Sequence, residues 1–119
     1  MHAIPASAMH PNRKYFVGQS MDNKIVVYDW KGSVKLNRKK KFIGHSNAGY
    51  ACGLSFSPDG QFLCSGDSEG KLWFWDWKNG KNLRTMKWHD KVCIDVAWHP
   101  IETSKVATCS WDGSIKLWD

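Results

Sequence analysis

The chain has 119 residues, 42% of them hydrophobic, and its 17 Lys and Arg against 11 Asp and Glu give a net charge of +6. This length suits one globular domain, and no apolar run approaches the roughly 18 residues that a membrane span needs. The first residues lack the long apolar core of a signal peptide, and the positive charge favours acidic partners without identifying them.

Short runs of β-branched and aromatic residues, separated by turn residues, predict strands along the whole chain and leave no place for a helix. A first group is expected at Ile4–Met9, Tyr15–Val17, Ile25–Tyr28 and Ser33–Leu36. The second group is expected at Tyr50–Phe56, Phe62–Ser65, Leu72–Trp75 and Asn82–Met86. The third is expected at Val92–Trp98, Lys105–Cys109 and Ile115–Trp118.

The three groups are copies of one repeat. In each copy an acidic residue precedes an aromatic residue by six positions, and Asp follows the aromatic residue. The aromatics Tyr28, Trp75 and Trp118 are 47 and 43 residues apart. Proline stands 17 or 18 residues before each of these aromatics. Repetition at this period is typical of a propeller built from four-stranded blades.

Four cysteines, Cys52, Cys64, Cys93 and Cys109, show no paired spacing and fall inside the apolar runs. Buried, reduced thiols are therefore expected, as in an intracellular protein.

The combination of Gly44-His45, Ser57-Pro-Asp-Gly60 and Trp118-Asp119 resembles the WD40 repeat over essentially the whole chain. The resemblance implies an all-β, partial WD40 β-propeller of about three antiparallel blades. Their expected bounds are 1–41, 42–86 and 87–119, with the last blade lacking its outer strand. Because propellers typically close with 4–8 blades, we expect a part of a larger ring. Its neighbours would be the remaining blades of a parent propeller, or further copies of this chain in their absence.

The resemblance also implies a hydrogen-bonded tetrad of His, Ser or Thr, Asp and Trp inside each blade. The third copy carries the full set, which is His89, Ser110, Asp112 and Trp118. The first copy holds Ser20 and Asp22, with Tyr28 in place of Trp. The second keeps His45 and Trp75 but has Asp67 and Glu69 at the Ser and Asp positions.

A His, a Ser and an Asp in one repeat could also form a hydrolase triad. No Gly-x-Ser-x-Gly elbow surrounds Ser110, and the set follows the strand period, so a structural role is favoured. A zinc site from His89, Cys93 and His99 would have no known finger spacing. We expect no enzyme, no cofactor, no metal and no small-molecule substrate.

Several short segments outside the repeat consensus are similar to a family of nuclear WD40 splicing factors. These segments are residues 1–6, 19–23, 48–52, 89–94 and 102–106. This resemblance implies a non-catalytic protein-interaction scaffold of the spliceosome, acting in the nucleus at the second step of splicing, with other spliceosomal proteins as partners. The alternative is a WD40 adaptor in another complex, of the ubiquitin ligase or chromatin type.

Two surfaces are candidate contacts. The basic run Arg38, Lys39, Lys40 and Lys41 lies in an interval without acidic residues between Asp29 and Asp59. It could bind RNA or an acidic partner, or it could be a solvated sheet edge. Aromatic side chains on the rim of the ring could anchor a protein or cover neighbouring blades. The residues concerned are Trp88, Trp111, Tyr50 and the more polar Asn47.

Overall fold

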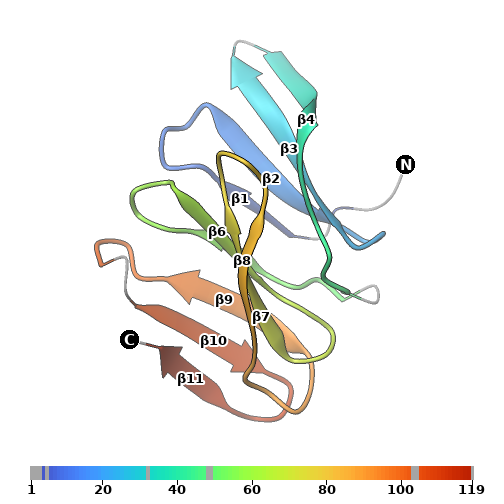
Figure 1. The fold of residues 1–119 in the computed structure, drawn as a ribbon, viewed down its shortest axis with the longest axis vertical. Coiled ribbons are helices and arrows are strands. Elements are labelled where there is room, and N and C mark those ends of the chain that lie inside the picture. Colours follow the sequence, from blue (N-terminus) through green and yellow to red (C-terminus); the bar gives the residue numbers. More distant parts are fainter. Residues whose placement is uncertain (1–3, 5, 32, 48–49, 103–104, 119) are drawn as a thin grey trace.

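The computed structural model describes residues 4, 6–31, 33–47, 50–102 and 105–118, and in these ranges it contains eleven strands and no helix. Consequently, no helix in the described part of the chain could cross a membrane. The molecule is a flattened stack of three antiparallel sheets with extents of 41 × 33 × 20 Å (Figure 1). The prediction of an all-β fold of about three blades is confirmed.

Each sheet is one blade, and its strands follow one another in space as they do in the chain. Blade one contains β1 (Ala6–Met9), β2 (Tyr15–Ser20), β3 (Lys24–Lys31) and β4 (Ser33–Ile43). Blade two contains β5 (Leu54–Phe56), β6 (Phe62–Gly66), β7 (Lys71–Asp76) and β8 (Asn82–Lys87). Blade three contains β9 (Cys93–Trp98), β10 (Val106–Ser110) and β11 (Ile115–Trp118).

The turns between the second and third strands of each blade share one backbone conformation. Asn23, Gly70 and Gly113 occupy equivalent positions and have φ angles of 66°, 82° and 88°. Glycine adopts this left-handed region without strain, and Asn tolerates it better than most residues. At Gly70 a side chain is excluded for a second reason, because a Cβ would lie 2.1 Å from the carbonyl oxygen of His89.

The strand β4 is longer than the sequence suggested, since it continues to Ile43 instead of ending near Leu36. Its pairing with β3 shifts register between Val26 and Val27, which pair with Lys41 and Asn37. The backbone of the run 38–41 therefore lies within this strand, at an irregularity, and not in a loop after it.

Two apolar clusters hold the blades together, one in each interface. The first joins blades one and two through Val17, Ile25, Val27, Phe42, Leu54, Phe56, Leu63 and Trp75. The second joins blades two and three through Cys64, Leu72, Phe74, Cys93, Val96 and Val106. Successive side chains of a strand point to opposite faces. A middle blade can therefore supply Leu63 to one interface and Cys64 to the other.

Candidate functional site

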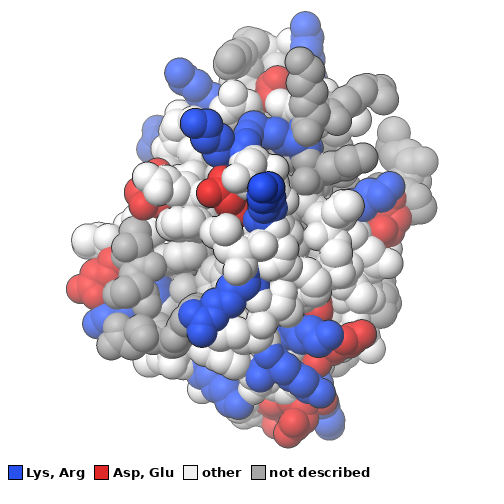
Figure 2. All heavy atoms as spheres, viewed as in Figure 1, with Lys and Arg blue, Asp and Glu red and all other residues white. Residues whose placement is uncertain are grey.

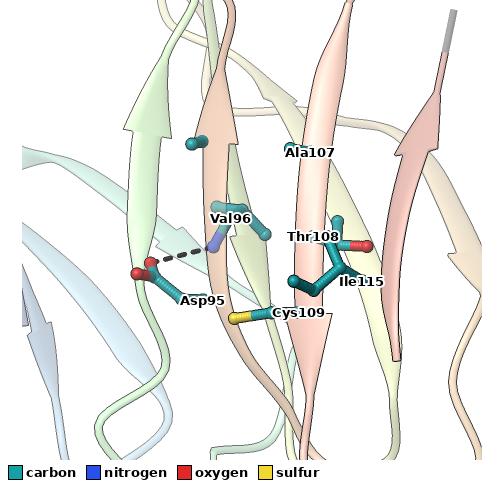
Figure 3. A pocket seen from close by; sticks show the side chains of 7 residues that line it. Asp95, Val96, Ala107, Thr108, Cys109 and Ile115 are labelled. Atoms are coloured by element: carbon teal, nitrogen blue, oxygen red, sulfur yellow. Dashed lines mark hydrogen bonds between the residues drawn. The ribbon is translucent and has the colours of Figure 1, made fainter. Parts of the chain in front are cut away.

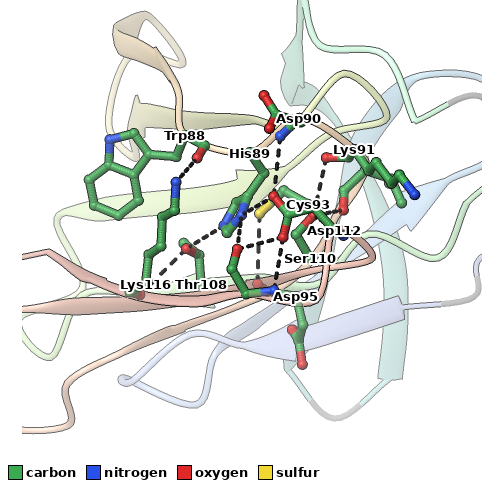
Figure 4. A network of polar contacts seen from close by, with 12 residues as sticks. Trp88, His89, Asp90, Lys91, Cys93, Asp95, Thr108, Ser110, Asp112 and Lys116 are labelled. Carbon is green, nitrogen blue, oxygen red and sulfur yellow. Dashed lines mark hydrogen bonds and ion pairs between the residues drawn. The ribbon is translucent and has the colours of Figure 1, made fainter.

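His89 is the centre of a polar network in blade three (Figure 4). Its Nδ1 lies 3.1 Å from Asp112 Oδ2 and 3.0 Å from the hydroxyl of Ser114, and its Nε2 lies 2.9 Å from Thr108 Oγ1. A carboxylate only accepts hydrogen bonds, so Nδ1 donates to Asp112, and Nε2 is hydrogen-bonded to the Thr108 hydroxyl. The network joins the segment before β9 to the turn after β10.

The expected Ser110 is not the hydroxyl of this network, and the assignment is corrected to Thr108. The pairing of β10 with β9 shifts register between Cys109 and Ser110, so the end of the strand turns away from His89. Ser110 Oγ instead lies 2.8 Å from the carbonyl oxygen of Val92 and accepts a bond from the Asp112 amide. Of the expected fourth member, Trp118, only the backbone lies within the described part of the chain.

Thr108, His89 and Asp112 have the connectivity of a nucleophile, a base and an orienting acid. However, Thr108 and His89 are each only 2% exposed, so a substrate cannot reach the hydroxyl. Hydrogen bonds from Ser114, from the backbone and from His89 hold the pKa of Asp112 below its ordinary range, which keeps it anionic.

The equivalent histidine of blade two, His45, has a partner from the neighbouring blade. Its Nε2 lies 2.5 Å from the amide oxygen of Gln19, a fully buried residue of β2. The amide nitrogen of Gln19 donates to the carbonyl oxygen of Cys52 at 3.2 Å and to Ser65 Oγ at 2.9 Å. Ser65 is the counterpart of Thr108, so Gln19 is inserted between the histidine and the hydroxyl. The sequence gives a signal for the hydroxyl position, because Ser65 and Thr108 align, but none for Gln19.

Burial lowers the pKa of His45 to about 4, against the opposing attraction of Asp67. The other ring nitrogen, Nδ1, has no hydrogen-bond partner among the described residues. The ring is therefore neutral under ordinary conditions.

Asp67 and Glu69 do not contribute to a tetrad. Asp67 accepts bonds from the backbone of Glu69 and Lys71 and from the indole of Trp73 at 2.7 Å, which closes the turn between β6 and β7. Glu69 is exposed and pairs with Lys71 at 2.9 Å. The indole of Trp75 donates to the carbonyl oxygen of Ile43 at 3.3 Å, so its partner is a backbone group of blade one.

In blade one the expected members lie apart. The carbonyl oxygen of Ser20 accepts a bond of 2.6 Å from the Asn47 amide, and Asp22 pairs with Lys24 at 3.5 Å. Tyr28 stacks on Phe16, with ring centroids 5.0 Å apart, on the apolar side of blade one that faces away from blade two.

The rim is the end of the sheets that carries the turns β2–β3, β6–β7 and β10–β11. Tyr50 and Trp111 meet there edge to face across two blades, with centroids 4.9 Å apart, and remain 37% and 56% exposed. Trp88 is half-buried, accepts a bond on its carbonyl oxygen from the Lys116 ammonium, and lines a hollow of about 270 Å³ with Lys87 and Leu117. Asn47 is fully buried, so the expectation that it contacts a partner at the rim is wrong.

Of the basic run, only Lys40 has a described side chain. Its ammonium donates to the carbonyl oxygens of Trp77 and Lys78, at 3.0 and 3.3 Å, and lies 4.9 Å from the Trp77 ring centroid. Lys40 therefore ties blade one to blade two. Figure 2 shows the described Lys and Arg side chains spread along the viewed face.

The cysteines are thiols, and three of the four are buried. Burial raises the pKa of Cys52 and of Cys93 to about 12, so both stay protonated. Within the described ranges no three His, Cys, Asp or Glu side chains are grouped to hold a metal ion, and both ring nitrogens of His89 are already engaged.

Comparison with known proteins places this geometry in a family. The profile of the "WD domain, G-beta repeat" matches residues 36–76 and 80–119. Pre-mRNA-processing factor 17 of Homo sapiens and that of Mus musculus are each 55% identical to the chain over 119 residues, which is 100% of this chain and 21% of each relative. The Saccharomyces cerevisiae protein of the same name is 44% identical over 99% of this chain and 26% of its own length.

The chain thus spans about a fifth to a quarter of the length of these relatives and aligns with the C-terminal region of the human and mouse proteins. With three antiparallel blades, a histidine network in blade three and a matching profile over most of its length, the chain belongs to the WD40 repeat family.

Proposed function

We propose that the chain is part of a non-catalytic scaffold that binds other proteins of the splicing machinery in the nucleus and acts around the second step of splicing. The observation that carries this proposal is the 55% identity over the whole chain to proteins named Pre-mRNA-processing factor 17. At this level of identity, the shared residues include positions at which the WD40 fold does not require a particular residue.

The site geometry supports a binding role. The side chains that could carry acid–base chemistry in blade three are buried in a closed network. The exposed chemistry at the rim is instead aromatic, since Tyr50 and Trp111 present two ring surfaces that neighbouring blades hold in place. Rigid, partly exposed aromatic side chains are typical anchors of protein interfaces.

The test is affinity purification of the tagged chain, within its full-length protein where it is part of one, from nuclear extract, with mass spectrometry of the proteins retained. Splicing proteins should be enriched, and Trp111→Ala should reduce their recovery about tenfold or more, as loss of a hot-spot aromatic does. Ile101→Ala is the matched control, because Ile101 is 80% exposed at the opposite end of the same blade. Enrichment of ubiquitin ligase or histone machinery instead would support the adaptor alternative and overturn this one.

We also propose that Arg38, Lys39 and Lys41 contact RNA. Lys40 is excluded from this set, because its ammonium is bound to blade two. Each phosphate contact contributes about 0.7 to the log–log salt slope of single-strand binding. Replacing the three residues by Gln should therefore flatten the slope by about 2, whereas Lys40→Gln should leave it nearly unchanged. Equal slopes in the triple variant and the wild type would remove the RNA contact.

A further inference from the structure

The turn between the second and third strands of a blade has an exposed tip, even where the next blade covers its base. In blade one the tip is Met21, which is 40% exposed. The same turn is covered by blade two, because the backbone amide of Asn47 donates to the side chain of Asn23 at 2.9 Å. The equivalent tip of blade three is Trp111, so its 56% exposure belongs to its place in the turn.

Trp111 lies beside the segment that opens its own blade. Its amide donates to the carbonyl oxygen of Val92 at 3.2 Å, and the amide of Asp90 donates to Asp112 Oδ2 at 3.2 Å. These two bonds tie the tip of the turn to both ends of the short segment 90–92. Figure 4 shows the Asp90 carboxylate pointing away from the network around His89.

Blade two shows how close the two positions are. The residues equivalent to Asp90 and Trp111 are Ser46 and Ser68. The Ser68 amide donates to the carbonyl oxygen of Ser46 at 2.7 Å, and the two hydroxyls are 3.3 Å apart. In blade three an exposed carboxylate and an exposed indole take the places of these two hydroxyls.

The Asp90 carboxylate differs from its neighbours in having room for a ligand. Asp95 accepts a bond of 2.9 Å from the Val96 amide, beside a shallow apolar hollow of about 110 Å³ (Figure 3). Asp112 accepts bonds from its own turn and from His89. The side chain of Asp90 has no hydrogen-bond or ion-pair partner among the described residues.

Tyr50 completes the site from blade two. Its ring meets that of Trp111 at an interplanar angle of 90°, so the two rings form a corner at the rim. Its amide donates to the carbonyl oxygen of Asn47 at 2.7 Å, which holds its backbone in place. The segment from the opening histidine to the turn proline is longer in blade two than in blade three, as 45–58 against 89–100 shows. The repeat therefore does not require a residue at the place of Tyr50.

We propose that Tyr50, Trp111 and Asp90 bind an arginine side chain from a basic segment of a partner protein. This inference rests on the protein-binding role proposed above for the rim and adds the chemistry of the partner. The guanidinium would lie on the indole face, which attracts cations, and would donate to the carboxylate. The aliphatic part of the side chain would pack on the tyrosine ring. Arginine suits this corner better than lysine, because its planar and weakly hydrated head can stack and form paired hydrogen bonds at once.

The charges at this corner favour a cation over RNA. Exposed aromatic rings can also stack nucleobases, but a phosphate would then approach Asp90 and the anionic Asp112. Lys91 is the exposed cation of the same segment, so the two carboxylates leave the local charge negative. The chain as a whole has a net charge of +6. The corner is therefore acidic on a basic protein.

The test is fluorescence anisotropy with the chain, within its full-length protein where it is part of one. The probe is a fluorescein-labelled peptide in which arginines alternate with Gly-Ser pairs. The matched probe has citrulline in place of arginine, because citrulline keeps the shape of the side chain without its charge. The arginine peptide should bind about tenfold more tightly than the citrulline peptide, as expected for a hydrogen bond between charged groups.

Three variants locate the binding. Asp90→Asn and Trp111→Ala should each weaken binding of the arginine peptide about tenfold. Lys91→Gln is the matched control, and it should leave the affinity unchanged or raise it, because it removes a like charge. All three side chains are exposed, and urea unfolding checks that each variant is folded.

Equal affinity for the two peptides would overturn the proposal, and so would wild-type affinity in Asp90→Asn. Single-stranded RNA that displaces the peptide, and that binds less tightly to Lys91→Gln and Trp111→Ala, would assign the rings to RNA and overturn it too. If splicing proteins are retained through Trp111 while the arginine peptide does not bind, this inference fails and the splicing role stands. Binding of the peptide without retained splicing proteins would overturn the splicing role and leave the arginine site in place.

Discussion

The histidines that open blades two and three occupy the same position in the repeat but have different partners. His89 lies between Thr108 and Asp112 of its own blade. His45 donates instead to Gln19 of the preceding blade, and its second nitrogen has no partner among the described residues. One histidine closes its blade, and the other connects two blades.

Blades two and three thus have a histidine-centred polar network at the same place, but its members differ. In blade three Asp112, in the turn after the second strand, brings a negative charge to the network. In blade two the corresponding residue, Glu69, is exposed and pairs with Lys71, and among the described residues no group replaces it at His45 Nδ1. The neutral amide of Gln19 instead lies at Nε2, between His45 and Ser65, where blade three has a direct contact of histidine and hydroxyl.

The largest expected effect concerns the apolar faces of the same two blades. Leu72→Ala should lower the free energy of unfolding by about 2–5 kcal/mol, because it leaves a cavity between blades two and three. Ile115→Ala, at the equivalent position of blade three, should change it by about 0.5 kcal/mol or less, because Ile115 is 79% exposed. Urea unfolding of both variants and the wild type measures the two losses. Equal losses would mean that Ile115 is buried in the folded chain, against its 79% exposure.

The second prediction concerns pH and separates the two histidines. In the unfolded chain His45 takes up a proton near pH 6.5, but in the folded chain only near pH 4. The contribution of neutral His45 to the free energy of unfolding is therefore complete above pH 6.5. As the pH falls to about 4, proton uptake by the unfolded chain lowers the free energy of unfolding by on the order of 3 kcal/mol.

Urea unfolding at several pH values measures this loss, and His45→Gln is the control. A glutamine does not titrate, so the variant should lose less stability than the wild type between pH 6.5 and 4. If the two pH profiles ran parallel, His45 would not be the buried neutral group described above.

The smallest effect tests which hydroxyl belongs to the network of blade three. Thr108→Val keeps the shape of the side chain but leaves His89 Nε2 without a partner in a buried place, at a cost of about 1–3 kcal/mol. Ser110→Ala should cost about 0.5–1.5 kcal/mol, because Ser110 is partly exposed and water can replace its bond to the Val92 carbonyl. A larger loss for Ser110→Ala than for Thr108→Val would restore the assignment made from sequence.

Much of the fold could be predicted because its signals are local. The turns that Pro11, Pro58 and Pro100 begin have residue types with strong backbone preferences, and the strands between them are short runs rich in β-branched and aromatic residues. The third strands were located to within a few residues, as Leu72–Trp75 against the observed Lys71–Asp76 shows. The fourth strand of blade one was predicted too short, to Leu36, because the charged residues that follow do not have a strand-like pattern, whereas pairing with β3 keeps them extended.

The sequence by itself determined the three copies, their strand order and the positions of His45 and His89, since spacing along the chain is enough to define them. Only the tertiary structure decided the partners of these histidines. Gln19 reaches Ser65 over 46 residues, and a register shift at the end of β10 turns Ser110 away while Thr108 stays in place. Pairing register and blade packing set which side chains meet, and neither is encoded in the spacing of a single repeat.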